Sequence, residues 1–455
     1  MLAASISAAF GLLQYFGFAE AFGPWIKDAY PGEAFANLRQ RNHFATLTGI
    51  GLLGLIALVA CPDRLSKNAE AVKPPWWTSV AALLLALGNA ASNSRTGLLQ
   101  WLLIFILVTL WVYPYSHRRY IMKFAAKAVF FYAVAIVALP WLLTNLTGFA
   151  AGGLFGRLGE APTCQSRAIL WSNVLTLIFQ KPWFGWGWGE LAYPHFITPY
   201  TGARFCGILD NAHNLPLHIA VELGIPAALI ICTSLGWMVW HAKPWNEPNA
   251  GTQMVWGVLA VIMLHSLLEY PLWYGPFQIA VGLCIGFIFI SSKKGPLINS
   301  TSRQIISKKS SNNLSKVNPG SFFLNITIFS ALATVGFDYD RVTSIYLLSP
   351  KESIAFHHDV QEKSNRFSLF KDQVSFAKLG LIELAPANAV ATHILASSLL
   401  HYSPEPLVIE KVIESALMLG STDEALMYLA RYRDVFPRDH ARWVIEHPNL
   451  MVYMK

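Results

Sequence analysis

The chain has 455 residues, of which 54% are hydrophobic and only 13% are charged, and its mean hydropathy is +0.41. Because a soluble domain carries about 25% charged residues, this composition excludes an ordinary soluble protein and indicates a membrane protein. The net charge of +8 does not indicate nucleic-acid binding, because the basic excess lies entirely before residue 338: 22 Lys and Arg stand there against 11 Asp and Glu, and the remainder has 12 against 15. The sequence has no CxxC pair and no HExxH or Walker motif.

About nine apolar stretches are predicted to cross the membrane, since a spanning helix needs about 20 mostly apolar residues. Backbone in lipid must satisfy its own hydrogen bonds, so these spans are helices. In chain order they are 1–18, 43–61, 76–95, 97–115, 124–144, 214–240, 252–270, 272–290 and 321–337. Met1 opens directly into the first stretch, with no basic flank and no signal-peptide cleavage site, so we expect further spans upstream.

Basic residues set the orientation of these spans. The loops after the second, fourth, sixth and eighth spans hold 14 Lys and Arg against three acidic residues, whereas the other side, up to Phe337, holds eight of each sign. The positive-inside rule places the first set in the cytoplasm. Segments 19–42 and 145–213 and everything after 337 are then predicted to face the periplasm of a bacterial inner membrane.

The expected fold is all-α and has four regions. Residues 1–144 are membrane helices, 145–213 a long periplasmic loop, and 214–337 further membrane helices with a Ser-, Asn- and Lys-rich cytoplasmic linker at 291–320. Residues 338–455 are predicted to form a helical periplasmic domain. Its segment 417–437 resembles tetratricopeptide-type helix pairs, and a generic helical cap is the alternative.

Polar residues at the ends of spans are costly and usually have a function. Arg39, Gln40 and Arg41 precede the second span and can bind a phosphate or sugar hydroxyls; interfacial snorkelling is the alternative. Arg95, in the short turn between the third and fourth spans, offers bidentate pairing to a pyrophosphate. The alternative there is a solvated Arg in a tight turn.

The loop 145–213 holds two further features. Arg167 and Trp171 share one helix face by their i, i+4 spacing, and the Gly- and Trp-rich run 181–190 can stack on sugar faces or form an interfacial aromatic belt. Cys164 and Cys206 share this loop in an oxidising compartment. We therefore predict a disulfide that closes a loop of about 42 residues and contributes a few kcal/mol through loop entropy.

Two clusters lie at the outer ends of the later spans. His213 precedes the sixth span and is flanked by Asp210 and Asn214, an arrangement typical of an oriented general base; a polar cap is the alternative. Glu269 and Tyr270 join the seventh and eighth spans, where an aromatic belt is the alternative. The predicted topology brings all the clusters to one side of the bilayer. Together they suit a lipid-pyrophosphate donor and a hydroxyl acceptor.

These motifs resemble the O-antigen ligase and O-antigen polymerase superfamily. The resemblance is carried by Ser94-Arg95-Thr96, by Arg167 with Trp171, by 182–187, and by His213-Asn214 ahead of 222–226. Segments 39–43 and 268–274 are similar to its PglL-type branch, the bacterial O-oligosaccharyltransferases that glycosylate pilins and other periplasmic proteins. That branch has a periplasmic C-terminal domain and more spans than are predicted here, so the chain is expected to be N-terminally truncated relative to it.

The resemblance implies a glycosyltransferase without metal or cofactor. Its donor would be an undecaprenyl-diphosphate-linked oligosaccharide, and its acceptor a Ser or Thr hydroxyl of a periplasmic protein such as a pilin. His213 would be the base, and Gln40 and Tyr270 the other residues needed for transfer. The diphosphate is expected on Arg95, Arg167, Arg39 and Arg41, with Asp210, Asn214, Glu269 and Trp171 as supporting residues.

Two enzymes with the same donor are the nearest alternatives, an O-antigen polymerase and a lipid A-core O-antigen ligase. The periplasmic tail favours a protein acceptor. Outside the enzyme class, a lipid or glycan transporter would place polar residues near the midplane of the membrane, whereas the clusters here lie at the outer ends of spans. A non-catalytic scaffold would need no such convergence.

Overall fold

The computed structural model describes residues 1–60, 75–113, 118–150, 153, 164–293, 319–347 and 369–448. All regular structure within these ranges is helical, which supports the prediction of a helical membrane protein. Most of the predicted linker 291–320, and residues 154–163 of the predicted loop, lie outside the described residues. The chain divides into two compact units, and each is described by itself.

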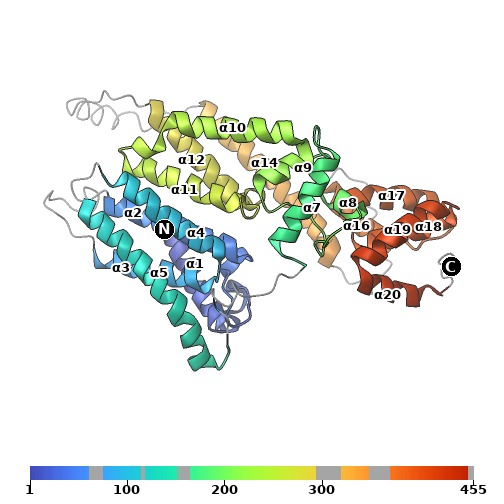
Figure 1. Cartoon of the computed structure of the whole chain (residues 1–455), viewed down its shortest axis with the longest axis horizontal. Helices are drawn as coiled ribbons and strands as arrows, with labels where there is room; N and C mark the ends of the chain where they lie inside the picture. Colours follow the sequence, from blue (N-terminus) through green and yellow to red (C-terminus); the bar gives the residue numbers. More distant parts are fainter. Residues whose placement is uncertain are drawn as a thin grey trace. The chain divides into compact units, whose positions relative to one another are not determined.

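The first unit comprises Met1–Thr163, Ala212–His218 and Ala228–Gly295. Helix α2 is its centre and packs against α1, α3, α4 and α11. Small residues allow this close packing: a Cβ added to Gly51 of α2 would lie only 2.6 Å from the Cβ of Ala4. The helices of this unit are α1 (Leu2–Tyr15), η1 (Ala19–Trp25), η2 (Ala36–Leu38), α2 (Arg41–Ala60), α3 (Trp76–Ala91), α4 (Arg95–Trp111), α5 (Arg118–Thr147), most of α10 (Ile225–Ala242), η4 (Pro244–Asn246), α11 (Ala250–Ser266), η5 (Pro271–Trp273) and α12 (Gly275–Lys293) (Figure 1).

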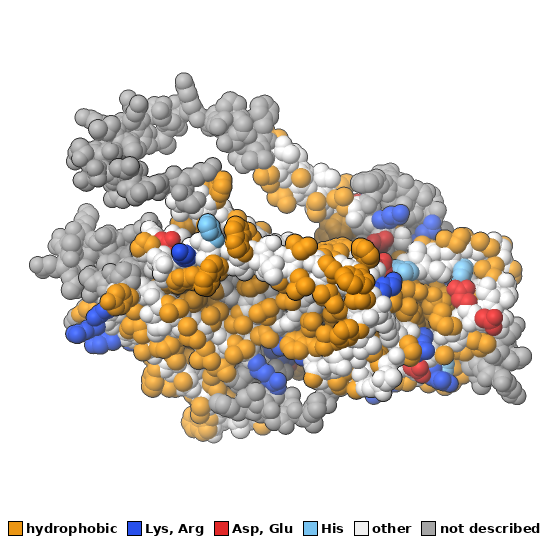
Figure 2. Space-filling model, turned by 45° about the horizontal axis from the view of Figure 1, so that its top comes forward, with side chains coloured by type: hydrophobic (Ala, Val, Ile, Leu, Met, Phe, Trp, Pro, Cys, Tyr) orange, Lys and Arg blue, Asp and Glu red, His pale blue; other side chains and the backbone are white. Residues whose placement is uncertain are grey.

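Three described helices are long and apolar enough to cross a membrane, Arg41–Ala60, Arg118–Thr147 and Ile225–Asn246, and five further apolar helices are shorter. The count of about nine spans therefore stays a prediction. Figure 2 shows hydrophobic side chains over much of the visible surface, with few charged ones among them. Ile230, Trp237 and Trp240 of α10 are exposed, as expected for a helix that faces lipid.

The second unit comprises Cys164–Asn211, Ile219–Ala227 and Pro296–Lys455. Its helices are α7 (Arg167–Gln180), α8 (Ala192–Ile197), the end of α9 (Leu215–Leu223), α14 (Pro319–Leu347), α16 (Lys371–Leu381), α17 (Ala389–Tyr402), α18 (Pro406–Met418), α19 (Thr422–Val435) and α20 (Pro437–Glu446). Helices α17, α18 and α19 pack side by side in chain order (Figure 1). Whether this domain is a tetratricopeptide repeat stays a prediction.

Helix α8 of the predicted periplasmic loop is part of the core of these C-terminal helices. Phe196 is 1% exposed and belongs to the same buried cluster as Leu399 and Val412. Its ring stacks on that of Tyr428, with centroids 6.3 Å apart. The loop and the C-terminal helices therefore share one hydrophobic core, although about 200 residues of sequence lie between them.

The single span expected over 214–240 is wrong, because the run consists of two helices, α9 and α10, which meet at Gly224. Pro226 has no N–H to donate to Glu222, so a continuous helix would leave that carbonyl without a partner. The Trp- and Gly-rich loop supplies donors instead: Trp186 N to Val221 O and Gly187 N to Glu222 O, both 2.9 Å. In exchange, Ile225 N donates to Pro182 O at 2.8 Å. We call this the loop–helix interlock.

The loop–helix interlock predicts different effects for two glycines with similar backbones. Gly185 (φ +66°) has no room for a Cβ, which would collide with the Glu222 carbonyl, whereas Gly189 (φ +77°) has nothing within 4 Å. Gly189→Ala should lose about 1–2 kcal/mol through left-handed strain alone. Gly185→Ala should lose clearly more. Thermal unfolding midpoints of the two purified variants in detergent check this, and equal midpoints would contradict the interlock.

Candidate active site

His213 is held at the junction of the long loop and α9. Its backbone is left-handed, with φ +50°, which is uncommon for a residue other than glycine. The next residue fixes this conformation from two sides: Asn214 Oδ1 accepts from Leu217 N at 3.1 Å, and Asn214 Nδ2 donates to Leu267 O at 3.0 Å. The first bond caps the start of α9, and the second ties His213 to the end of α11.

The His213 imidazole contacts the carboxylate of Glu269, with Nδ1 2.7 Å from Oε2. The Glu269 side chain is 8% exposed and that of His213 is 26% exposed. A hydrogen bond from Nδ1–H to the carboxylate places the proton-accepting lone pair on Nε2. We expected Asp210 or Asn214 to orient His213. The carboxylate found in contact with the ring is that of Glu269, and Asn214 caps α9.

Two amides from the start of α2 donate to the same carboxylate. Gln40 Nε2 lies 3.4 Å from Glu269 Oε2, and Asn42 Nδ2 lies 3.0 Å from Oε1. The ring of Tyr270 meets that of His213 edge-on, with centroids 4.8 Å apart. Gln40, His213, Glu269 and Tyr270, which sequence analysis placed in three clusters, thus lie together. We call these four residues the His213 cluster.

Asn42 connects the His213 cluster to the start of α4. Its Oδ1 accepts from Ser94 Oγ at 2.6 Å, and Ser94 Oγ accepts from Gly97 N at 2.9 Å as the N-cap of α4. Arg95, the first residue of α4, is exposed. A helix N-terminus carries partial positive charge, so Arg95 lies where a phosphate is favoured.

The other two arginines of this region flank Gln40. Arg39 ends η2 with a left-handed backbone, φ +58°, and so turns the chain into α2. Arg41 begins α2 and pairs with Glu33 at 3.6 Å, with both side chains at least one-third exposed. An exposed pair of this kind contributes little to stability.

Three expected site residues belong to the second unit. Arg167 is the first residue of α7 and follows Ser166, whose side chain caps the helix by accepting from Ile169 N at 3.4 Å. Arg167 therefore occupies the same helix position as Arg95. Trp171 follows one turn later, and Asp210 is exposed near the end of the loop.

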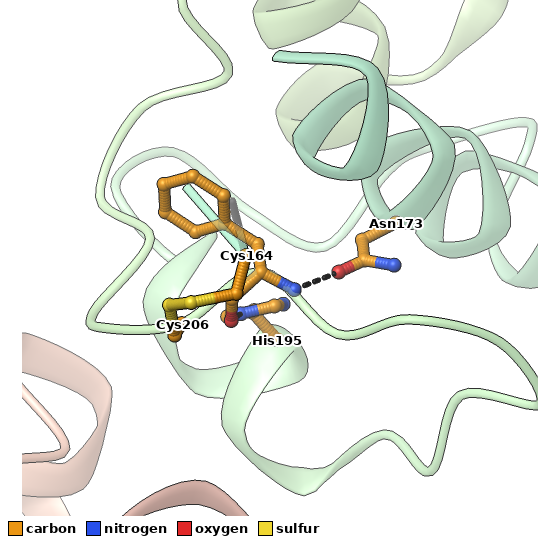
Figure 3. The surroundings of a disulfide bond; sticks show 5 residues. Cys164, Asn173, His195 and Cys206 are labelled. Carbon is orange, nitrogen blue, oxygen red and sulfur yellow. Dashed lines mark hydrogen bonds between the residues drawn. A yellow bond between two sulfur atoms is a disulfide. The ribbon is translucent and has the colours of Figure 1, made fainter. Parts of the chain in front are cut away.

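Cys164 and Cys206 are joined by a disulfide in the structure, with their Cα atoms 5.5 Å apart (Figure 3). Asn173 of α7 braces the same segment: its Nδ2 donates to Ala203 O at 3.0 Å, and its Oδ1 accepts from Phe205 N at 2.8 Å. The disulfide and this amide together hold residues 203–206 against α7.

His195 of α8 lies beside the disulfide and was not singled out by sequence analysis, since no motif marks it (Figure 3). Its Nε2 lies 3.2 Å from Phe205 O, which can only accept, so Nδ1 accepts from the Tyr200 hydroxyl at 2.8 Å. Burial, together with the charge of Arg204, lowers the pKa of His195 to about 3. This histidine is therefore neutral and bonded at both nitrogens, which indicates a structural role.

His265, which lies in the same predicted cluster as Glu269 and Tyr270, bonds to Thr46, which in turn bonds to Gln100, and no role was predicted for these two polar side chains. Thr46 Oγ1 lies 2.8 Å from His265 Nδ1 and accepts from Gln100 Nε2 at 2.7 Å. All three side chains are buried. Buried polar groups need partners, so these bonds fix how α2, α4 and α11 pack. The signal that could have found Thr46 and Gln100 is a polar residue inside a predicted span.

Three family models match the chain. They are described as O-Antigen ligase (residues 80–232), Protein glycosylation ligase (34–59) and Virulence factor membrane-bound polymerase, C-terminal (253–450). The Protein glycosylation ligase match covers Gln40 and Asn42, and the O-Antigen ligase match covers Arg95 and Arg167. The polymerase match covers Glu269.

Two curated proteins of Acinetobacter baylyi are similar to the chain. One, a General O-oligosaccharyltransferase, is 28% identical over 282 residues, which cover 59% of this chain and 46% of the relative. The other, a ComP-specific O-oligosaccharyltransferase, is 26% identical over 276 residues, which cover 60% and 47%. The chain thus spans about half the length of the curated relatives it matches. No solved structure matches it.

The buried neutral His195 predicts a pH-dependent stability. Its folded pKa of about 3 lies below the ordinary value of 6.5, so the unfolded chain binds the proton more readily. Stability from this group is therefore full above about pH 6.5 and falls as the pH drops, by about 2 kcal/mol near pH 5. His195→Gln, which can bond at both positions without titrating, should lose less stability between pH 7 and pH 5 than the unmodified protein. Thermal midpoints measured at both pH values check this; equal losses would contradict it.

Proposed function

We propose, from its similarity to the PglL-type branch of the O-antigen ligase superfamily, that this chain is an O-oligosaccharyltransferase. It would transfer an oligosaccharide from a lipid diphosphate, of the undecaprenyl type, to a Ser or Thr hydroxyl of a periplasmic protein such as a pilin. The observation that supports this best is the His213–Glu269 contact inside the His213 cluster. A hydroxyl is a poor nucleophile, and an imidazole oriented by a carboxylate is a suitable base for it.

In the proposed reaction the acceptor oxygen forms a bond to the anomeric carbon of the sugar while the bond from that carbon to the diphosphate oxygen breaks. The hydroxyl proton passes to His213 Nε2. Glu269 stabilises the resulting imidazolium, because the proton on Nδ1 already binds the carboxylate at 2.7 Å. Gln40 and Tyr270, which touch Glu269 and His213, would position the sugar or the acceptor.

The diphosphate gains negative charge as its bond to the sugar breaks, so catalysis requires positive groups that stabilise this charge. Arg95 begins α4, and Arg167 begins α7. At each position the guanidinium and the partial positive charge of the helix N-terminus both attract an anion. Arg39 and Arg41 add charge on either side of Gln40. We assign these four arginines to the diphosphate. No step of this reaction calls on a metal ion.

The first test removes the proposed base and its partner. His213→Ala should reduce transfer by about 10²–10⁴-fold, the usual contribution of a general base. Glu269→Gln keeps the acceptor oxygen that Asn42 uses but removes the charge that stabilises the imidazolium, and should also lose at least about 10²-fold. His241→Ala, at the exposed end of α10, and exposed Glu383→Gln are matched controls expected to keep full transfer.

The readout is the mass gained by an acceptor protein in cells that also make a lipid-linked glycan, with the amount of each variant in the membrane measured by immunoblot. Full transfer by His213→Ala at a normal membrane level would show that another group is the base. A normal rate for Glu269→Gln would show that the carboxylate is not needed.

The acceptor separates this proposal from its nearest alternatives. The match of residues 253–450 to a polymerase model is the observation that favours an O-antigen polymerase as the second candidate. Expression of the gene with a glycan pathway, a pilin and lipid A-core should show mass added to the pilin. Glycan polymers on the carrier lipid would instead assign a polymerase, and modified lipid A-core would assign a ligase.

A further inference from the structure

Five large apolar side chains of α7 and the loop that follows it are exposed. They are Leu175, Phe179, Trp183, Phe184 and Trp188, with exposed fractions of 42%, 73%, 71%, 90% and 67%. The first three follow one another at i, i+4 spacing. The opposite face of α7 is buried through Leu170, Val174, Leu177 and Ile178. We call the five exposed residues the apolar ridge.

The exposure of the apolar ridge is imposed by the fold. The loop that carries Trp183, Phe184 and Trp188 is fixed by the loop–helix interlock, and Gly185 between them meets the Glu222 backbone. Trp186 in the same loop turns inward: its Nε1 donates to Leu177 O at 3.0 Å, and Lys181 Nζ lies 4.0 Å from its ring centroid. The hydrogen-bonded backbone of this loop thus leaves the rings of Trp183, Phe184 and Trp188 exposed.

The attachment point of this loop indicates what covers the ridge. Pro182 O accepts from the backbone N–H of Ile225, the first residue of α10. Ile225–Asn246 is long and apolar enough to cross a membrane. A segment bonded to the end of a membrane-crossing helix lies at the level of the lipid headgroups, where Trp side chains are enriched.

Charge and composition agree with a lipid partner. The charged residues of 167–189 are Arg167 and Lys181, with no acidic residue. The next residue, Glu190, is acidic, and its Oε2 lies 2.6 Å from His401 Nδ1. Basic side chains beside an apolar face suit an anionic membrane surface. By contrast, the described residues of helices α16 to α20 in the same unit expose no Trp or Phe among their large hydrophobic side chains.

We propose that the apolar ridge inserts into the headgroup region of the phospholipid bilayer on the periplasmic side, with Lys181 at the lipid phosphates. The loop that carries Arg167 is then attached to the membrane surface from which a lipid-linked substrate is presented. This proposal does not depend on the transfer reaction, because lipid contact is measured without turnover.

The test uses the whole chain in vesicles of phosphatidylethanolamine and phosphatidylglycerol that contain no polyprenyl lipid. Cys61, Cys232 and Cys284 are replaced by Ala, the Cys164–Cys206 disulfide is kept, and a nitroxide is attached at Phe184→Cys. Phe184 is 90% exposed, so its replacement removes little packing. The matched control is Val390→Cys, an exposed apolar position on α17.

The ratio of collisions with oxygen to collisions with a water-soluble nickel chelate should be several-fold higher at 184 than at 390, since oxygen concentrates in lipid. A second label at Phe179→Cys should give the same result. Equal nickel access at 184 and 390 would overturn the proposal. Spin–spin broadening at 184 that disappears on dilution with unlabelled protein would also overturn it, because a second copy of the chain would then cover the ridge.

Discussion

The first unit is organised around one buried carboxylate. Glu269 is 7% exposed, and a carboxylate removed from water must be compensated by donors or it will not stay ionised. Its contacts include Gln40, Asn42 and His213, which come from the start of α2 and from the end of the long loop. Satisfying this one charge therefore fixes how three distant parts of the chain meet. Asn42 also accepts a hydrogen bond from Ser94, so the same set of bonds positions the first turn of α4.

Much of the candidate site could be predicted from sequence, because membrane orientation restricts where polar groups can gather. The predicted orientation placed the clusters on one side of the bilayer, and the resemblance then selected Gln40, His213 and Tyr270 among their residues. The partner of His213 could not be predicted in this way. Asp210 and Asn214 are its sequence neighbours, but which side chain reaches an imidazole depends on backbone direction, and the left-handed φ of His213 is a property of the folded turn.

The fold prediction failed at a place where backbone hydrogen bonds compete with hydropathy. An apolar run over 214–240 satisfies every criterion of composition and length, yet it is interrupted at Gly224. Pro226 was the sequence signal that indicated this break, since it leaves the Glu222 carbonyl without a helical donor. That the donor comes from Gly187, in a loop some 35 residues earlier, follows from tertiary structure and leaves no trace in the hydropathy of the run.

The burial of Phe196 among the C-terminal helices limits how proteins of this type can be recombined. A loop that contributes its own aromatic side chain to another domain's interior is inherited with that domain, because neither half keeps its core without the other. Exchanging residues 164–211 between relatives to alter selectivity would create a cavity or an overpacked interior unless 369–448 moved with them. Natural variation in the loop should accordingly covary with that of α17, α18 and α19, and the smallest unit that can be transplanted intact consists of both segments.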